Sequence, residues 1–396
     1  MRIEYVETVN TGDSNIVRLV NAIFCRALEM QASDIHIEPI GEYSRVRLRL
    51  DGLLVELCRL PIIRHNAIVS RIKLLSEMDI SEKRLPQDGR LALEFKNRKI
   101  DLRIASLPTI EGEKLAIRVL DKDMNVLDLD SIGLGPANAQ KYAKLIHNAN
   151  GLVLVTGPTG SGKTTTLYAT LNEINAPSKN IVTLEDPVEY HLTGINQVAL
   201  NKKIGLDFNL GLSSLVRQDP NIVMLGEIRD VQGATFAVQA ALTGHLVFST
   251  LHTNSALGAV NRLLDMGIEP FLLVASLRGV VAQRLVRQIC PYCQEEYEAG
   301  QLELACLKQE KDCNLLLRRG RGCSYCQQSG YKGRLALQEI MVMDEVLAGM
   351  IIRGQEESRQ LAHMREQGFQ SLLEDGRRKV LQGRTTVEEL IRTSIL

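Results

Sequence analysis

Along the first 120 positions, apolar and polar residues follow a helical spacing once and then alternate. From 16 to 28 the apolar residues fall three and four positions apart, which predicts a helix buried along one face. Alternating runs, which are typical of half-buried strands, follow at 35–38, 46–50, 91–95 and 100–104. Asp51-Gly52 comes directly after one of these runs and predicts a two-residue hairpin turn. We therefore expect residues 1–120 to form a small α+β domain.

The pattern changes after residues 121–136, a mixed segment that we interpret as a linker. Short, continuous apolar runs, which are typical of buried parallel strands, follow at 152–156, 181–185, 222–225 and 246–250. Helical patterns stand between most of these runs, which predicts an α/β domain with a doubly wound, mainly parallel sheet over 137–289. Residues 290–334 contain paired cysteines, and residues 335–396 show helical periodicity without a convincing strand. We expect these two segments to be a metal-binding insertion and a helical end-piece.

Composition narrows the class of protein. Apolar residues make up 45% of the chain, and 47 Lys and Arg balance 47 Asp and Glu. A net charge of zero argues against a globally basic nucleic-acid binder and against an acidic disordered tail. The longest apolar runs, 151–156 and 270–275, are far shorter than the roughly 18 residues that suggest a membrane span. The first residues do not form a secretory signal, so we expect a soluble intracellular protein without a transmembrane segment.

A glycine-rich run carries the strongest chemical signal. It consists of Gly157, Pro158, Thr159, Gly160, Ser161, Gly162, Lys163 and Thr164, and is followed by Thr165. It matches the phosphate-binding pattern G-x-x-x-x-G-K-[ST], and it stands between a predicted strand and a predicted helix, as such a loop must. Backbone N–H groups would face the β-phosphate, Lys163 would reach the β- and γ-phosphates, and the Thr164 hydroxyl would bind Mg²⁺. The sequence therefore predicts a nucleoside triphosphate site here.

Acidic residues follow two strands of the same predicted sheet. Glu227 comes after the run at 222–225, and Glu185 and Glu189 lie at and beyond the end of the run at 181–185. Ligands of such sheets bind at the carboxyl ends of the strands, so these carboxylates are placed to orient a metal or the attacking water. A helix-capping or solvated acid is the alternative for each. His252 follows the run at 246–250 and is a candidate γ-phosphate sensor, although a lone His is more often structural.

Four of the eight cysteines form two C-x-x-C pairs, Cys290 with Cys293 and Cys323 with Cys326. In a chain without a secretory signal, such pairs favour a metal site over a disulfide framework. Four thiolates suit a closed, structural Zn²⁺ site, and chance pairs of reduced cysteines are the alternative. Residues 315–334 add five basic residues and no acid, which is more typical of a solvated or partner-facing surface than of a nucleic-acid site. An acidic lipid surface is a further alternative.

Together these motifs resemble the secretion and pilus ATPase superfamily. Beyond the Walker A run, 184–189 resembles the family's Asp box, 217–220 and 226–230 resemble its Walker B, and 243–254 resembles its His box. Upstream, 32–39 and 84–90 resemble its second N-terminal domain. The resemblance extends along nearly the whole chain and is closest to the type II secretion (GspE) and pilus assembly (PilB) branches.

The resemblance implies a RecA-like ATPase domain preceded by a PAS-like domain, with ATP, Mg²⁺ and Zn²⁺ as ligands. It implies a homo-hexameric motor in which Arg103 and Arg118 close over the γ-phosphate; without the resemblance, each would be a solvated arginine on an alternating strand. It further implies a cytoplasmic protein, peripheral at the inner membrane, whose partners are a membrane platform protein and an associated cytoplasmic docking protein. The motor would assemble a type IV pilus or a type II secretion pseudopilus, and the tetracysteine element favours these roles over retraction.

Two other functions are compatible with the same P-loop α/β fold. One is a RecA-like nucleic-acid translocase, which a DNA affinity that falls steeply with salt would support. The other is a small-molecule P-loop kinase, which the absence of a phosphorylated product would dismiss. Family members also carry a further domain before the region of Ser33 and Asp34, whereas about 30 residues precede it here, so we expect a truncated or a naturally short member.

Overall fold

The computed structural model describes residues 9–10, 15–121, 128–201, 204–310 and 313–395. The chain divides into two compact units, Met1–Asn125 and Val126–Leu396, and each is described by itself. The expected linker at 121–136 begins at the last residue of a strand, and its residues 122–127 lie outside the described part. Its final residue, Pro136, already begins a helix.

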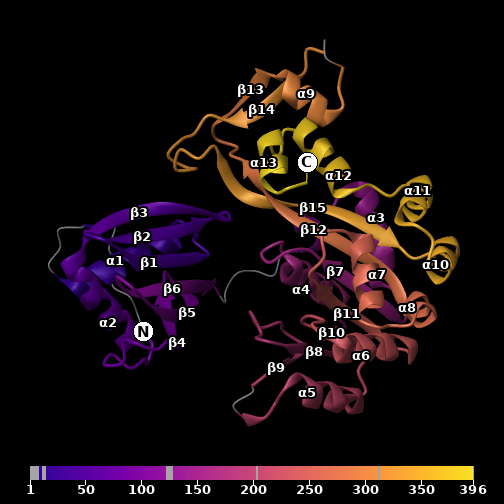
Figure 1. The fold of residues 1–396 in the computed structure, drawn as a ribbon, viewed down its shortest axis with the longest axis horizontal. Helices are drawn as coiled ribbons and strands as arrows, with labels where there is room; N and C mark the ends of the chain where they lie inside the picture. The colour runs from indigo at the N-terminus through magenta and orange to yellow at the C-terminus, as the bar shows by residue number, and fades with distance from the viewer. Residues whose placement is uncertain (1–8, 11–14, 122–127, 202–203, 311–312, 396) are drawn as a thin grey trace. The chain divides into compact units, whose positions relative to one another are not determined.

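In the first unit, the described strands form one antiparallel sheet in the order β3-β2-β1-β6-β5-β4 (Figure 1). The strands are β1 (Asp34–Ile40), β2 (Tyr43–Leu50), β3 (Leu53–Pro61), β4 (Gln87–Phe95), β5 (Arg98–Thr109) and β6 (Gly112–Asp121). The helices are α1 (Ile16–Glu29) and α2 (His65–Leu75). Apolar side chains of both helices share one buried core with the inward residues of the sheet, such as Ile23, Ile68 and Ile117.

The expected elements of this unit are confirmed where the alternation was clearest. The Asp51-Gly52 turn joins β2 to β3, and both residues have the positive φ angles, 47° and 90°, that a tight hairpin of this kind needs. Helix α1 begins directly after the capping residue Asn15, whose side chain accepts a hydrogen bond from the Arg18 backbone N–H.

The second unit holds a larger set of elements. Its helices are α3 (Pro136–Ile146), α4 (Lys163–Ile174), α5 (Phe208–Leu215), α6 (Val231–Leu242), α7 (Ala256–Asp265), α8 (Pro270–Ser276), α9 (Gln301–Leu307), α10 (Glu345–Ile352), α11 (Glu357–Glu366), α12 (Leu372–Leu381) and α13 (Val387–Arg392). Its strands are β7 (Gly151–Thr156), β8 (Ile181–Glu185), β9 (Asn196–Ala199), β10 (Ile222–Leu225), β11 (Leu246–Leu251), β12 (Leu277–Ile289), β13 (Gln294–Glu298), β14 (Leu316–Gly320) and β15 (Tyr331–Val342).

Within the described residues, the main sheet of this unit has the order β15-β12-β7-β11-β10-β8-β9, and every pair except β12 with β15 is parallel. Successive residues of β7 point into different cores. Leu152 and Leu154 pack with α5–α8 on one face, whereas Val153 and Val155 pack with α3 and α4 on the other. The four apolar runs that the sequence marked as buried parallel strands are therefore confirmed, and helices cover both faces of the sheet (Figure 1).

The expectation of a purely helical end-piece over 335–396 is wrong at its beginning. Residues up to Val342 belong to β15, which pairs along most of β12 and extends the main sheet. The polar pair Gln338 and Glu339 interrupts the apolar pattern of this strand, yet both side chains are buried. Their hydrogen-bond partners come from β12 and from two helices distant in the sequence, which sequence periodicity does not reveal.

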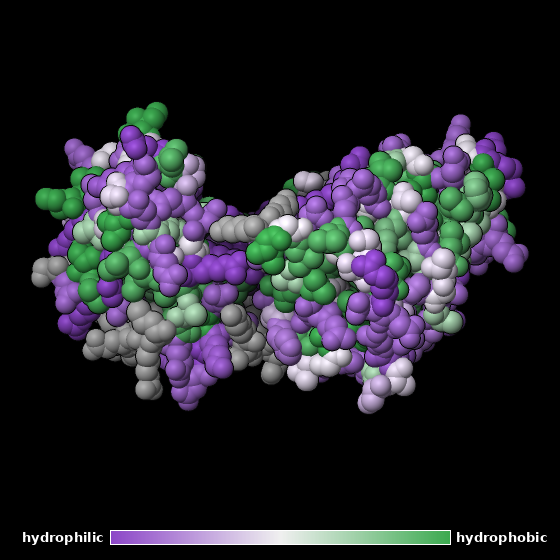
Figure 2. All heavy atoms as spheres, turned by 90° about the horizontal axis from the view of Figure 1, so that it is seen from below, coloured by the Kyte–Doolittle hydropathy of each residue, from purple (hydrophilic) through white to green (hydrophobic). Residues whose placement is uncertain are grey.

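The surface and the helix lengths agree with the composition. On the face that Figure 2 shows, hydrophilic and hydrophobic residues are interspersed over each unit. Among the described helices, none combines the length and the apolar character needed to cross a bilayer.

Candidate nucleotide-binding site

The glycine-rich run leaves the carboxyl end of β7 and leads directly into α4. Gly157, Gly160 and Gly162 have positive φ angles of 153°, 77° and 86°, which lets the loop turn back over the amino end of the helix. Pro158, Thr159 and Gly160 form the exposed rim, and Thr164 and Thr165 lie in the first turn of α4. The loop therefore directs the N-terminal dipole of α4 and its unpaired N–H groups toward one point, which is an anion-binding arrangement.

Two observations show that this loop fits a phosphate group. A side chain at Gly157 or Gly162 would lie 2.4 Å or 2.8 Å from atoms of Gln283, so only glycine permits the observed backbone. The hydroxyl of Ser161 is buried and has no hydrogen-bond partner among the described residues. A buried hydroxyl without a partner is costly, and a bound phosphate oxygen would satisfy it.

Lys163 lies across the mouth of the loop. Its ammonium group donates to the carbonyl oxygens of Gly157 and Pro158, at 2.8 Å and 3.1 Å. Burial lowers the pKa of Lys163, and the carboxylate of Glu227 partly opposes this shift. A buried cation whose ammonium group donates to backbone carbonyl oxygens is placed to bind an anionic ligand.

Glu227 follows β10 and stands at the centre of a charged cluster. Its carboxylate accepts a hydrogen bond from Arg229 and lies 3.1 Å from Nε2 of His252. Arg229 also approaches the carboxylate of Asp186, at 3.6 Å. Because β8, β10 and β11 run parallel and adjacent, the residues beyond their carboxyl ends meet at the edge where the P-loop lies.

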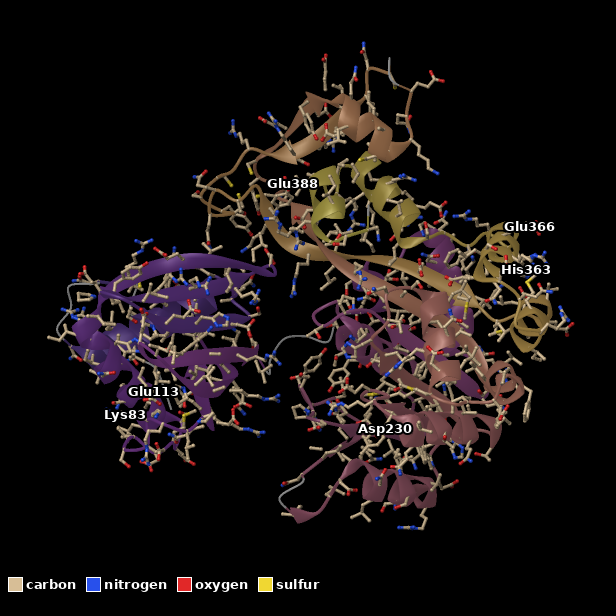
Figure 3. All side chains as sticks on the ribbon, viewed as in Figure 1. Lys83, Glu113, Asp230, His363, Glu366 and Glu388 are labelled. Atoms are coloured by element: carbon tan, nitrogen blue, oxygen red, sulfur yellow. The ribbon has the colours of Figure 1, made fainter. Side chains whose placement is uncertain are left out.

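Hydrogen bonds between strand ends fix the backbone under this cluster. The Thr250 hydroxyl donates to the carbonyl of Gly226 at 2.8 Å, and the Thr253 N–H donates to the hydroxyl of Thr156 at 2.9 Å. The second bond ties the end of β7, where the P-loop begins, to the residue after His252. Asp230, labelled in Figure 3, caps α6 by accepting from the Gly233 N–H at 2.9 Å.

Glu185 has a different environment from Glu227, although the sequence places both at or just beyond the end of a predicted parallel strand. It is only 4% exposed, and its carboxylate accepts from the hydroxyl groups of Tyr168 and Thr183 and from the amide of Gln197. Burial and the adjacent Glu185 raise the pKa of Tyr168, which keeps this phenol a hydrogen-bond donor. The Glu189 backbone N–H donates to the same phenol at 3.3 Å, so Glu185 and Glu189 lie around Tyr168.

Arg103 and Arg118 lie in the first unit. They are directly opposite each other on β5 and β6, and Arg118 in turn is opposite Asp34 on β1. Asp34 lies 3.7 Å from the Arg118 guanidinium and 3.4 Å from that of Arg49. The structure thus brings the two predicted arginines together in one cross-strand row on the face of the sheet away from α1 and α2.

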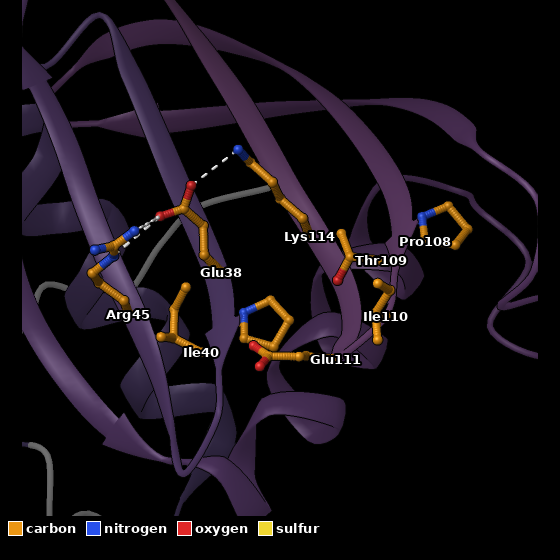
Figure 4. Close-up of a pocket in the computed structure, with 9 residues that line it drawn as sticks. Glu38, Ile40, Arg45, Pro108, Thr109, Ile110, Glu111 and Lys114 are labelled. Carbon is orange, nitrogen blue, oxygen red and sulfur yellow. Dashed lines mark hydrogen bonds and ion pairs between the residues drawn. The ribbon is translucent and has the colours of Figure 1, made fainter.

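A shallow pocket of ≈ 550 Å³ lies near the end of the same face (Figure 4). One of its two acidic residues, Glu38, is already paired with Arg45, Arg47 and Lys114 at 3.1, 2.8 and 2.9 Å. Burial opposes the charge on Glu38, but hydrogen bonds from Arg47 and Lys114 outweigh it and lower the pKa of Glu38 to about 2. This charge network stabilises the sheet, and the pocket offers no arrangement comparable with the P-loop.

The four predicted cysteines come together in the second unit. Cys290 and Cys293 flank the step from β12 to β13, and Cys323 and Cys326 lie between β14 and β15. All four sulfurs lie within 4.8 Å of one another, and three pairs are separated by 3.7–4.0 Å. Sulfurs about 2.3 Å from a tetrahedral zinc ion lie roughly 3.8 Å apart, so the cluster has the size of a zinc site.

Sequence reasoning missed several residues of the nucleotide site. Arg229 lies in the segment that resembles Walker B, but no sequence pattern distinguishes it from a solvated arginine. Gln283 lies on β12, a strand that the sequence patterns do not predict. Its hydrogen bonds with Ser161 of the P-loop and Thr166 of α4 join residues more than a hundred positions apart. Its only sequence signal is a polar residue within the mostly apolar stretch 277–289.

Comparisons with known proteins agree along the whole chain. A family model described as Type II/IV secretion system protein matches residues 9–392. The Type II secretion system protein E of Pseudomonas aeruginosa is 48% identical over 382 residues, which cover 96% of this chain and 76% of that protein. The Type II secretion system ATPase E of Vibrio cholerae is 45% identical with the same coverage. The solved structure of the Yersinia pseudotuberculosis ATPase DotB shares the fold, with a TM-score of 0.73 and 21% identity over 99% of this chain and 97% of that chain.

Proposed function

This chain belongs to the type II/IV secretion system protein family, and on that premise we propose that it is an ATPase whose hydrolysis of ATP drives type II secretion. The observation that carries the proposal is the shared edge of the sheet. There the P-loop with Lys163 lies beside a carboxylate, Glu227, that is paired with His252 and Arg229. Such an edge binds a triphosphate and also holds a group that can orient water.

Each residue at this edge has a proposed part in hydrolysis. The P-loop N–H groups and Lys163 bind the β- and γ-phosphates and neutralise charge as the terminal phosphoryl group departs. The Thr164 hydroxyl would hold Mg²⁺, which neutralises phosphate charge when it is bound. Glu227 orients the attacking water, and His252, which lies 3.1 Å from it, holds that carboxylate in place and is our candidate sensor of the γ-phosphate.

Glu185 and Glu189 support the site indirectly in this scheme. The Glu185 carboxylate accepts hydrogen bonds from three donors, out of about four that a carboxylate can accept, and it is buried, so it has little remaining capacity to polarise water. We propose that Glu185 holds Tyr168 of α4 against β8, and that Glu189, whose backbone N–H also contacts Tyr168, extends this contact. The catalytic carboxylate of our proposal is therefore Glu227.

Arg103 and Arg118 are proposed to complete the site from the first unit, in a homo-hexamer. Their position side by side on an exposed sheet face suits recognition of a phosphate by two guanidinium groups. Such arginines are worth about 10³–10⁵ in rate when they reach the transferring phosphoryl group. Two units that approach and separate with the nucleotide state would convert hydrolysis into movement.

We propose that Cys290, Cys293, Cys323 and Cys326 hold a structural Zn²⁺. The four sulfur atoms have the spacing of a tetrahedral zinc site. Because all four ligands come from the protein, no coordination position is left for a substrate. Burial disfavours a thiolate at Cys326, but hydrogen bonds from backbone N–H groups, including that of Cys323, outweigh it and lower the pKa of Cys326 to about 6. A metal here would fasten β13 and β14 to the main sheet.

The driven machine is proposed from the family resemblance together with the relatives' names, which specify type II secretion: a type II secretion pseudopilus or a type IV pilus, reached through a platform protein and a docking protein at the inner membrane. A nucleic-acid translocase is less well supported. Of the basic residues between 315 and 334, Arg318 and Arg319 are paired with Glu296 and Glu295 across β13 and β14, at 3.1 Å and 3.0 Å. Paired arginines attract phosphate backbones weakly.

The test is Mg²⁺-dependent ATP hydrolysis per chain as a function of protein concentration. Specific activity should rise with concentration, because Arg103 and Arg118 complete the site of a neighbouring chain, and Lys163→Ala should abolish hydrolysis. Constant specific activity across a range in which the protein stays monomeric would refute the ring-motor mechanism. Undiminished hydrolysis by Lys163→Ala would refute the assignment of the site itself.

A further inference from the structure

Strand β12 passes directly behind the P-loop, and one of its residues contacts the loop at both ends. Ala282 is the last residue of β12 that pairs with β7, opposite Thr156, so Gln283 stands just beyond the ladder where the P-loop begins. A side chain at Gly157 would lie 2.4 Å from the Gln283 carbonyl oxygen, and one at Gly162 would lie 2.8 Å from its side-chain nitrogen. The backbone and the side chain of Gln283 therefore both bound the phosphate cradle.

The Gln283 side chain is 2% exposed, and its amide has three hydrogen-bond partners. Its nitrogen donates to the carbonyl of Ser161 at 2.7 Å, and its oxygen accepts from the hydroxyl of Thr166 at 2.8 Å and from the amide of Gln338 at 3.2 Å. In a planar trans peptide, the C=O of one residue and the N–H of the next point in opposite directions. The bond to the Ser161 carbonyl therefore turns the Gly162 N–H away from Gln283 and toward the cradle.

The contacts continue from Gln338 into the helical part of the unit. The Gln338 backbone N–H donates to the carboxylate of Asp375 on α12 at 2.9 Å, and Lys379 donates to the same oxygen at 2.8 Å. Asp375 and Lys379 are each 1% exposed, and Gln338 is fully buried. These residues connect the P-loop with α12 through direct hydrogen bonds between buried groups.

We propose that Gln283 is a positioning residue that orients the P-loop for phosphate binding and couples the loop to α12. The inference rests on the proposed function, because it assumes that nucleotide binds at the P-loop. Phosphate binding stiffens the Ser161–Gly162 peptide, and this restraint passes through Gln283 and Gln338 to Asp375. Such coupling is reciprocal, so a change at α12 alters nucleotide affinity by the same factor by which nucleotide alters α12.

The first test measures the binding of Mg²⁺-ADP to the full chain. Gln283→Met keeps the size of the side chain but removes all three hydrogen bonds, and we expect its dissociation constant to rise about tenfold or more. Gln288→Met is the matched control, because Gln288 lies on the same strand beyond the P-loop contacts, and it should bind ADP like the wild type. Gln283→Glu is a second variant of the same shape. Its neutral form can still donate to the Ser161 carbonyl and its anion cannot, so its affinity should fall as pH rises from about 5 to 8, unlike that of the wild type.

The second test measures hydrogen exchange of α12 with and without saturating ADP, with α10 as the internal reference. ADP should slow exchange in α12 more than in α10 for the wild type and Gln288→Met, and this difference should disappear in Gln283→Met. Asp375→Asn should also weaken ADP binding, and combining it with Gln283→Met should add little, because both break one chain of contacts.

The outcomes separate this inference from the proposed function. If the wild type does not bind ADP, the proposed function fails and the inference fails with it. If the wild type binds ADP and Gln283→Met binds it equally tightly, or retains the effect on α12, only the inference is overturned. Additive effects of Gln283→Met and Asp375→Asn would likewise overturn the coupling.

Discussion

Replacing two carboxylates by amides, in Glu185→Gln and Glu227→Gln, tests whether the site is assigned correctly. Glu185 is the last residue of one parallel strand and Glu227 lies just beyond another strand of the same sheet, and both resemble metal- or water-orienting acids in the sequence. The structure gives them opposite environments, because Glu185 is 4% exposed and accepts three hydrogen bonds, whereas the Glu227 side chain is 26% exposed and its charge opposes the lowering of the Lys163 pKa. We expect the first change to reduce stability and the second to reduce hydrolysis.

The expected cost at Glu185 follows from its three donors. An amide at this position accepts hydrogen bonds at one end only, so it places an N–H group against at least one of the donors from Tyr168, Thr183 and Gln197. Hydrogen bonds to a charged group are worth about 1.5–3 kcal/mol each, which gives a loss of about 2–4 kcal/mol. For a unit of this size, the loss corresponds to a fall in Tm of roughly 5–15 °C.

The expected pattern at Glu227 is the reverse. Its partners Arg229 and His252 are half-exposed, and exposed ion pairs contribute about 0–1 kcal/mol, so Tm should change by a few degrees at most. Loss of the group that orients water should lower the hydrolysis rate by about 10²–10⁴. Glu173→Gln, on the exposed surface of α4, removes the same charge and should change neither property.

The assays are initial rates of Mg²⁺-dependent ATP hydrolysis, measured well below each Tm, and thermal unfolding of the same samples. The reasoning would be refuted if Glu185→Gln kept its Tm and lost hydrolysis, since Glu185 would then act on water directly. It would also be refuted if Glu227→Gln hydrolysed ATP at the wild-type rate.

Three further changes test other parts of the molecule. Arg103→Ala should retain nucleotide binding and lower turnover by about 10³–10⁵, whereas Arg59→Ala on β3 should not; normal turnover in Arg103→Ala would reject the arginine assignment. Cys323→Ser should release zinc and loosen residues 290–330, because structural zinc binding is coupled to folding; wild-type protein without zinc by elemental analysis would contradict this. Glu38→Gln should lower the free energy of unfolding by about 1–3 kcal/mol at pH 7, with Arg45, Arg47 and Lys114 left unpaired. Because folding lowers the pKa of Glu38 to about 2, the stability it contributes is present above pH 4.5 and is lost as pH falls toward 2, so denaturation curves of the two proteins should converge there.

Much of the fold could be predicted from local patterns. The hairpin at Asp51-Gly52 and the four buried parallel strands depend on residue spacing and turn chemistry, which are properties of neighbouring residues. Strand β15 could not be predicted in this way, because the hydrogen-bond partners of its polar residues Gln338 and Glu339 lie on β12, α7 and α12. Burial of a polar side chain depends on partners that only the folded chain supplies.

The candidate site also combines features that neighbouring residues determine with features that depend on distant partners. The sequence by itself determined the phosphate loop and the cysteine pairs, because both depend on a few residues at short, fixed spacing. Only the tertiary structure decided that Glu227 lies open beside Lys163 while Glu185 is enclosed by donors, and that Gln283 holds the loop from a distant strand. Both carboxylates end similar strands, and their difference comes from side chains that the sheet and its helices bring together. Hydrogen-bond partners and burial are set by distances in space, which adjacency in the chain does not specify.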